Sequence, residues 1–113
     1  MELTSTQRGS VTIIALQGNL MGGPDASQLN TKLHELAESG KKQIVIDLSG
    51  VQFMNSSGLG LLIGGVSALK NAGGSLRIAN ASEKILSLIT ITKLGSVLQT
   101  YPSIEAALES FSK

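Results

Sequence analysis

The stretch Ile44-Val45-Ile46-Asp47-Leu48, followed by Phe53-Met54-Asn55-Ser56-Ser57-Gly58-Leu59-Gly60, decides the fold of this chain. Its first part is apolar without alternation, which is typical of a strand covered on both faces in the middle of a parallel sheet. Beyond the link Ser49–Asn55, apolar residues recur at helical spacing up to Gly73-Gly74, at Leu59, Leu62, Ile63, Val66 and Leu69. The stretch therefore predicts a central strand over Gln43–Leu48, a loop, and a helix over Leu59–Asn71.

The segments before this stretch predict an antiparallel hairpin and a helix. Leu3–Gln7 and Val11–Gln17 are rich in β-branched residues and are separated by the short link Arg8-Gly9-Ser10, a pattern typical of two paired strands. Pro24 then stands at an expected first helical turn, and Gly40 is expected to end the helix. Between them the apolar residues follow helical spacing at Ala26, Leu29, Leu33, Leu36 and Ala37.

The segments after the stretch alternate between strand and helix. Ser75–Ala79 predicts a short strand and Val97–Gln99 a last one, with a helix capped by Ser82 between them. The β-branched run Ile89–Thr92 leaves a strand as an alternative to the end of that helix. A fourth helix is expected to open at Ser103, and its apolar face carries Ile104, Ala107, Leu108 and Phe111.

This order of elements predicts an α/β fold. We expect a mixed, mostly parallel sheet with an N-terminal antiparallel hairpin and about four helices. In such sheets the functional loops gather at the carboxyl ends of the strands. The loops to search are therefore Gly18–Gly23, Ser49–Ser57 and Asn80–Ser82.

The composition fits one compact domain over residues 1–113 and excludes several classes of function. The chain has 113 residues, 9 basic against 8 acidic side chains, no cysteine and 42% hydrophobic residues, which suffices for a core without disulfides or a metal. Without cysteine there is no thiolate nucleophile and no iron–sulfur cluster. The near-neutral charge and the few aromatic residues provide no basic field and no stacking surface, so we expect no nucleic-acid partner.

The expected location is the cytoplasm. The start of the chain lacks the charged and apolar segments of a signal peptide. The apolar run Gly58–Val66 is shorter than the roughly twenty residues of a membrane span. We therefore expect a monomer without a membrane span.

Few residues offer the chemistry of an active site, so we expect no enzymatic activity, no cofactor and no metal. His34 is the single histidine, and a solvated helix position accounts for it without a catalytic partner. Asp47 lacks acidic partners at neighbouring strand ends and is expected to cap or pair locally. Gly58, Gly60 and Gly64 form a loose version of the dinucleotide fingerprint, and we expect Gly60 and Gly64 to let the helix lie close to the sheet instead.

The most informative candidate is the loop formed by Phe53, Met54, Asn55, Ser56, Ser57 and Gly58. Asn and Ser oxygens at a helix start accept hydrogen bonds from the free amides, so capping accounts for part of the pattern. Two adjacent hydroxyls beside Phe53 and Met54 also suit a contact surface, although these two side chains can equally be buried. A phosphate on a serine here is stabilised by the helix dipole, while its charge disrupts an uncharged interface.

These residues resemble a known family. The segments Ile44–Leu48, Val51–Gly60 and Asn71–Gly74 are similar to the STAS domain of bacterial anti-sigma factor antagonists. The similarity extends from the early hairpin, through Gly18-Asn19-Leu20, to the last helix. The resemblance implies a binding module that captures an anti-sigma factor and so releases a sigma factor for transcription.

The resemblance also implies a serine switch. In the family the anti-sigma factor is often a serine kinase that phosphorylates the serine corresponding to Ser57, and a metal-dependent serine phosphatase removes the phosphate. We expect Ser56 to support the loop, and the missing Cβ of Gly58 to leave room for the partner beside Ser57. A second partner loop is implied at Asn19, Leu20, Met21, Gly22, Gly23 and Asp25.

Two departures from the family pattern bear on this switch. Family members usually carry Asp before the two serines, where this chain has Asn55, which retains a capping oxygen but lacks the carboxylate. Many relatives carry Glu-Leu-Asp after Gly18, where this chain has Asn19-Leu20-Met21, so the partner's identity does not transfer. The alternatives are an unphosphorylated STAS adaptor, for example of a lipid-trafficking ABC transporter, and, in a different class, a small nucleotide-binding enzyme.

Overall fold

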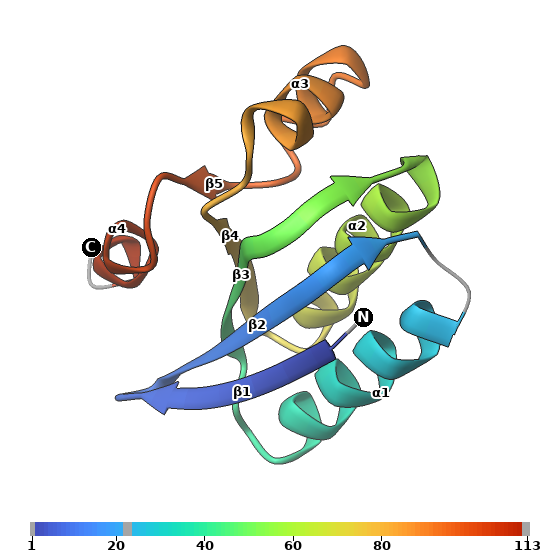
Figure 1. Cartoon of the computed structure of the whole chain (residues 1–113). Coiled ribbons are helices and arrows are strands. Elements are labelled where there is room, and N and C mark those ends of the chain that lie inside the picture. Colours follow the sequence, from blue (N-terminus) through green and yellow to red (C-terminus); the bar gives the residue numbers. More distant parts are fainter. Residues whose placement is uncertain (1, 22–23, 112–113) are drawn as a thin grey trace.

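The computed structural model describes residues 2–21 and 24–111, which form a five-stranded sheet with helices on both faces (Figure 1). The elements are β1 (Glu2–Arg8), β2 (Val11–Leu20), α1 (Pro24–Glu38), β3 (Gln43–Met54), α2 (Ser56–Asn71), β4 (Ser75–Ala79), α3 (Glu83–Ile91), β5 (Thr100–Tyr101) and α4 (Ile104–Ser110). The strands lie in the order β1-β2-β3-β4-β5. The pair β1–β2 is antiparallel and the other pairs are parallel, so the predicted α/β fold with an N-terminal hairpin is confirmed.

The β1–β2 hairpin closes through a two-residue turn at Gly9-Ser10. Gly9 has a φ of +62°, the left-handed conformation that a type II′ turn requires at its first central position. The pairing then runs from Arg8 opposite Val11 to Glu2 opposite Gln17 without a shift in register. The predicted hairpin is confirmed, with both strands longer than expected.

β3 is also longer than expected, and the link predicted at Ser49–Asn55 is wrong because the strand continues to Met54. Its register against β2 shifts twice, between Ala15 and Gln17 and between Gly18 and Leu20. At each shift β3 has one residue more than β2, as in a β-bulge, and this interrupts the alternation of inward and outward side chains. The buried apolar residues at the end of the strand are therefore spaced by three rather than two, at Leu48, Val51 and Met54.

The main core lies between the sheet and helices α1, α2 and α3 (Figure 1). The central run is buried on both faces as predicted, because Ile44, Val45 and Ile46 are each 0% exposed. Ile44 and Ile46 belong to the main core. Val45 belongs to a smaller cluster on the α4 face, with Val11, Ile13, Ala79 and Ala107.

Helix α2 packs on the sheet and contributes to the main core. Leu59, Leu62 and Leu69 are buried, as the helical spacing predicts. Ile63 and Val66 are half-buried at the margin of the core. The packing face of the helix is thus narrower than the sequence pattern indicates.

The packing role expected of Gly60 and Gly64 is wrong. Both are exposed, and a Cβ built on either would meet nothing within 4 Å. The close approach occurs at Gly65 instead, where a Cβ would lie 2.9 Å from Leu33 Cδ1 and 3.2 Å from Leu76 Cδ1. Gly65 therefore lets α2 lie against α1 and β4.

Helix α3 begins and ends within the range that the sequence allowed. Ser82 caps it by accepting a hydrogen bond from the Ile85 amide at 3.3 Å. The β-branched run after Leu88 is helical up to Ile91, because Ile85 and Ile89 lie on one face and are buried together. Burial of that face outweighs the strand propensity of the run.

The last strand differs from the prediction at Val97–Gln99. The Leu94 carbonyl accepts hydrogen bonds from the amides of Val97 and Leu98, both at 3.0 Å, so the chain turns there. The paired strand β5 follows at Thr100–Tyr101, beside Ile78 and Ala79 of β4.

Helix α4 covers the opposite face of the sheet from the other three helices (Figure 1). Ser103 caps it, as predicted, and accepts a hydrogen bond from the Ala106 amide at 3.0 Å. Arg77 of β4 contacts the carboxyl-terminal end of α4. The guanidinium lies 4.0 Å from the centre of the Phe111 ring and donates a hydrogen bond to the Ser110 hydroxyl.

Candidate functional site

The candidate site lies where β2 and β3 end side by side at the start of α2 (Figure 1). Asn55 is the N-cap of α2, and its side-chain oxygen accepts a hydrogen bond from the Gly58 amide at 2.9 Å. Its carbonyl accepts a hydrogen bond from the Leu59 amide at 3.0 Å. The capping role predicted for Asn55 is therefore confirmed, and the cap fixes the backbone that carries both serines.

Ser56 and Ser57 form the first turn of α2, and both side chains are exposed. Within the described part of the chain, neither backbone amide has a hydrogen-bond acceptor, because the first amides of a helix precede its ladder. These amides carry the positive end of the helix dipole. A negatively charged group on either hydroxyl would therefore be electrostatically favoured at this position.

Gly58 faces the protein interior, and so it does not open space for a partner as the sequence analysis expected. It is buried, and a Cβ there would lie 2.0 Å from the Leu20 carbonyl oxygen. The end of β2 thus presses against the first turn of α2. This contact brings together the two loops that the resemblance implied, and Leu20 is also paired with Met54 in the sheet.

The apolar residues of these loops divide between the core and the surface. Leu20 is 0% and Met54 5% exposed, whereas Met21 is 44% and Phe53 48% exposed. Asn19 is exposed as well. Of the two possibilities left open for these side chains, Met54 is buried, whereas Phe53 is exposed.

Part of the second loop, Gly22 and Gly23, lies outside the described residues, as does the side chain of Asp25. The described part of that loop, Asn19–Met21, lies beside the serine pair through Leu20.

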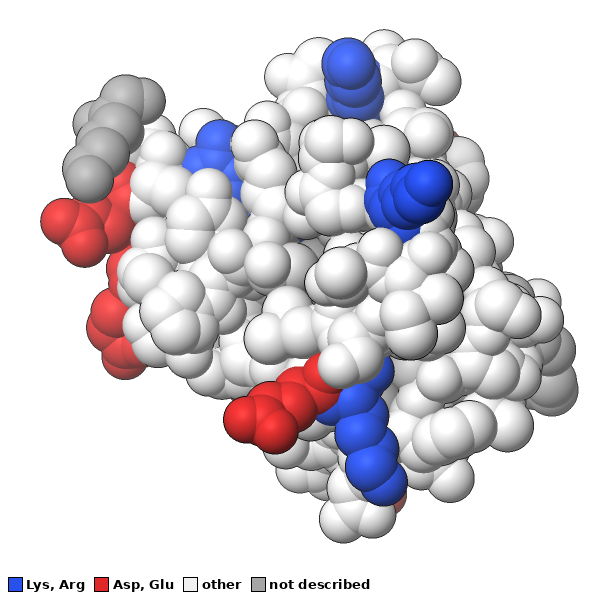
Figure 2. Space-filling view, turned by 90° about the horizontal axis from the view of Figure 1, so that it is seen from above, with Lys and Arg blue, Asp and Glu red and all other residues white. Residues whose placement is uncertain are grey.

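The chain segments that carry the serine pair and the end of β2 are uncharged. The sequence has no charged residue from Val11 to Met21 or from Leu48 to Leu69. Figure 2 shows large areas without charged side chains between separate Lys, Arg, Asp and Glu residues. A phosphate on Ser57 would thus place about −1.5 to −2 charges in a segment that otherwise has none.

Gly60 and Gly64 extend this surface along α2, which the sequence analysis missed. Both are exposed, and they follow Ser57 by three and seven residues, the helical spacing of one face. The spacing of the two glycines after Ser57 in the sequence could have indicated this shared face. At these two positions the face carries no side chain, while Leu61 between them is half-buried.

Asp47 forms local pairs, as expected. Its carboxylate oxygens accept hydrogen bonds from the Ser49 amide at 3.0 Å, the Ser49 hydroxyl at 3.1 Å and the Asn80 side chain at 3.0 Å. These bonds join the bulged part of β3 to the end of β4. Among residues 2–21 and 24–111, no group of three His, Asp or Glu side chains is arranged to hold a metal ion.

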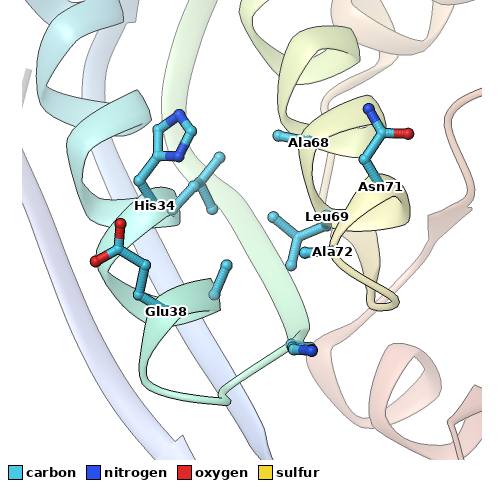
Figure 3. Close-up of a pocket in the computed structure, with 9 residues that line it drawn as sticks. His34, Glu38, Ala68, Leu69, Asn71 and Ala72 are labelled. Carbon is cyan, nitrogen blue, oxygen red and sulfur yellow. The ribbon is translucent and has the colours of Figure 1, made fainter.

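His34 lies in the second half of α1, beside the end of α2 that is opposite to the serine pair. It is exposed, as expected of a solvated helix position. It lines a pocket of about 430 Å³ between the carboxyl-terminal ends of α1 and α2, with Glu38 on its own helix and Asn71 on the facing one (Figure 3).

No helix in the described part of the chain is long and apolar enough to cross a membrane.

Comparison with known proteins gives consistent similarities. A model of the STAS domain family matches residues 2–107. The anti-sigma-B factor antagonist of Bacillus subtilis is 35% identical over 97 residues, which cover 83% of this chain and 88% of that protein.

Solved structures share the fold. An anti-sigma factor antagonist from Mycobacterium paratuberculosis superposes with a TM-score of 0.85 at 21% identity, over 99% of this chain and 94% of that one. The Bacillus cell fate determinant SpoIIAA, solved in its phosphorylated form, superposes with a TM-score of 0.73 at 21% identity, over 97% of this chain and 99% of that one.

Proposed function

This chain belongs to the STAS domain family, and within it to the anti-sigma factor antagonists; we propose that it binds an anti-sigma factor and so releases a sigma factor. The anti-sigma factor is a serine kinase in this proposal, and the chain acts in the cytoplasm as one domain. The observation that carries the proposal is the exposed serine pair at the start of α2, beside the end of β2.

The partner-binding surface comprises the loop Phe53–Gly58 and the end of β2. Phe53 and Met21 supply exposed apolar area, and burial of such area drives protein association. The polar groups next to the serine pair in the described residues, Asn19 and Asn55, are uncharged, so a partner desolvates no ionic group when it covers them. Gly22, Gly23 and Asp25 complete the second loop in the proposal.

Ser57 is the proposed phosphoacceptor. The kinase transfers the γ-phosphoryl group of ATP to the Ser57 hydroxyl oxygen, the hydroxyl proton passes to a base of the kinase, and ADP leaves. The phosphate adds about −1.5 to −2 charges. Those charges are tolerated in the free domain by the first-turn amides, but they oppose burial in an uncharged interface. A metal-dependent serine phosphatase restores the hydroxyl with water and releases inorganic phosphate.

The phosphorylated form of SpoIIAA supports this switch by its shared fold. Exposure alone does not distinguish Ser57 from Ser56, because both hydroxyls are accessible. The choice rests on the family position, which corresponds to Ser57. Ser56 is proposed to support the loop.

A phosphopeptide map of the chain isolated from its own cells tests the acceptor. We expect phosphate on Ser57, its loss in Ser57→Ala, and its retention in the matched control Ser56→Ala. Phosphate found only on Ser56, or on a serine outside the loop, would contradict the assignment.

The binding half of the proposal has its own experiment. A pull-down with mass spectrometry identifies the anti-sigma factor, and titration calorimetry then measures its affinity. Ser57→Ala should retain binding and Ser57→Asp should weaken it, because aspartate supplies part of the added charge. Equal affinity of the two variants would oppose a charge-driven switch.

A second candidate function rests on Asn55, which stands where the family usually has Asp. A STAS adaptor that is never phosphorylated, for example on a lipid-trafficking ABC transporter, needs the loop surface but no kinase. Asn55→Asp separates the two functions. Increased phosphorylation would mean that Asn55 lowers the response of the switch, and absence of phosphate from both forms would favour the adaptor.

We further propose that the chain has no catalytic activity of its own and needs no cofactor. The feature that favours a nucleotide-binding enzyme is the loose glycine pattern at Gly58, Gly60 and Gly64. The backbone of Leu20 leaves no room for a ligand group beside Gly58, and Gly60 and Gly64 lie on the exposed face of α2. Micromolar binding of ATP, ADP or NAD by the purified chain in calorimetry would contradict this part.

A further inference from the structure

The outer edge of β1 is an unprotected strand edge. β1 is the terminal strand of the sheet, and each of its residues except Leu3 is exposed. Natural edge strands are commonly protected from pairing by charged side chains, by proline or by a β-bulge. The charged residues of β1, Glu2 and Arg8, lie only at its two ends. β1 contains no proline, and its register against β2 is uninterrupted over all seven residues.

The hairpin geometry determines which backbone groups of β1 are free. In a two-residue hairpin the residues flanking the turn, here Arg8 and Val11, form a hydrogen-bonded pair. Hydrogen-bonded pairs then alternate along the strand, so Thr6, Thr4 and Glu2 also bond to β2. The intervening residues direct their N–H and C=O groups away from the sheet; they are Leu3, Ser5 and Gln7.

We propose that two copies of this chain pair through β1, antiparallel, about a two-fold axis at Ser5. Each Ser5 then exchanges backbone hydrogen bonds with the other Ser5, and Leu3 exchanges them with Gln7 of the second copy, so every outward group finds an acceptor or donor. The two sheets become continuous across the axis. This dimer replaces the monomer expected from the sequence.

The side chains of β1 favour this register. Residues of an antiparallel pair that lie opposite each other interact directly, and opposite charges or paired threonines stabilise the pair. The register places Glu2 opposite Arg8 of the second copy at both ends of the interface, and Thr4 opposite Thr6 between them. The sequence Glu-Leu-Thr-Ser-Thr-Gln-Arg is therefore complementary to itself when it is reversed.

The charge pair can form only between chains. Glu2 and Arg8 are six positions apart in the strand, which corresponds to about 20 Å. Within one chain, Glu2 is opposite Gln17 and Arg8 is opposite Val11. Energetic coupling between the two charges therefore reports on the proposed dimer and on its register.

Sedimentation equilibrium of the full chain, from micromolar to millimolar concentration, tests the proposal by charge reversal. Glu2→Arg alone and Arg8→Glu alone should each raise the dimer dissociation constant by about tenfold, because each places like charges opposite each other. An equimolar mixture of these two variants, and the chain that carries both changes, should dimerise like the original. A thermal melt of each variant checks that the exposed substitutions leave the fold intact.

A second variant addresses the backbone. Ser5→Pro removes an outward N–H without removing a bond to β2, so it should abolish the dimer, whereas the matched control Ser5→Ala should retain it. A chain that stays monomeric at every concentration would overturn the proposal. A dimer that is unaffected by Glu2→Arg would overturn it as well, since another face would then hold the copies together.

Discussion

Three glycines near Ser57 differ sharply in what surrounds them. A Cβ at Gly58 would lie 2.0 Å from the Leu20 carbonyl oxygen, and that backbone is fixed by pairing with Met54. Gly58→Ala should therefore lower the free energy of unfolding by about 2 kcal/mol or more. Gly60→Ala and Gly64→Ala should raise it by about 1 kcal/mol each, because alanine favours a helix and nothing obstructs its methyl group.

Urea denaturation of the three variants measures these changes side by side. The two exposed positions serve as matched controls, since they lie in the same helix and receive the same methyl group. Equal effects at Gly58 and Gly60 would show that the contact with Leu20 is not restrictive.

Asn55 gives a second test at this scale. Asn55→Ala removes the acceptor for the Gly58 amide and should cost about 1 kcal/mol of stability. Asn55→Asp keeps the acceptor and adds a negative charge at the helix start, so it should be at least as stable as the original chain. Chemical denaturation at neutral pH compares them. A stable Asn55→Ala variant would indicate that solvent replaces the cap without loss.

The chemistry of single residues explains what was predictable in the site. Asn55 follows the local capping rules, so its role can be deduced from the residues that adjoin it in the sequence. The contact between Gly58 and Leu20 joins segments that are far apart in the chain, and no local pattern indicates it. For the same reason, the sequence did not reveal which of Phe53 and Met54 is buried.

At the scale of the element, α2 provides a graded test of packing. Leu62 is 0% exposed, so Leu62→Ala should cost about 2–5 kcal/mol through lost burial and a cavity. Its neighbour Ile63 is half-buried, and Ile63→Ala should cost clearly less. Thermal melts followed by circular dichroism measure both. A larger loss at Ile63 would place the packing face of the helix elsewhere.

The lengths of the elements were predicted less well than their order. The Ile44–Ile46 run identified β3, but the two bulges change the spacing of its buried residues after Leu48. A period-two pattern cannot describe such a strand, so the sequence predicts a loop for its second half. The run Ile89–Thr92 shows the converse, because burial of Ile85 and Ile89 made a helix of β-branched residues.

At the scale of the whole molecule, Arg77 connects the sheet to α4. Arg77→Ala removes the stacking on Phe111 and the hydrogen bonds to Ser110 and Gln99. We expect faster hydrogen exchange of the α4 amides and little change in α2, since the two helices lie on opposite faces of the sheet. Arg77→Lys should give an intermediate effect, because lysine keeps the charge but loses the planar contact. Uniformly faster exchange throughout the protein would contradict a local role.

The overall architecture was the most predictable level. Alternating helix and strand signals, with one hairpin at the start, leave few sheet topologies that obey the rules of connection. The exception was the last strand, where a turn around Leu94 displaced the pairing from Val97–Gln99 to Thr100–Tyr101. Two paired residues are too few for any periodic signal.

The order of the strands has a consequence for synthesis on the ribosome. Each described strand pairs with the strand that precedes it in the chain, so a growing chain never has to insert a new strand between two that are already joined. Of these strands the hairpin emerges before the others; β3 then adds to the free edge of β2, β4 to that of β3, and β5 to that of β4 as they are translated. Domains begin to fold from the N-terminal side during translation. Truncated chains ending after β3 should therefore already protect the β1–β2 amides from exchange while the later segments are still missing.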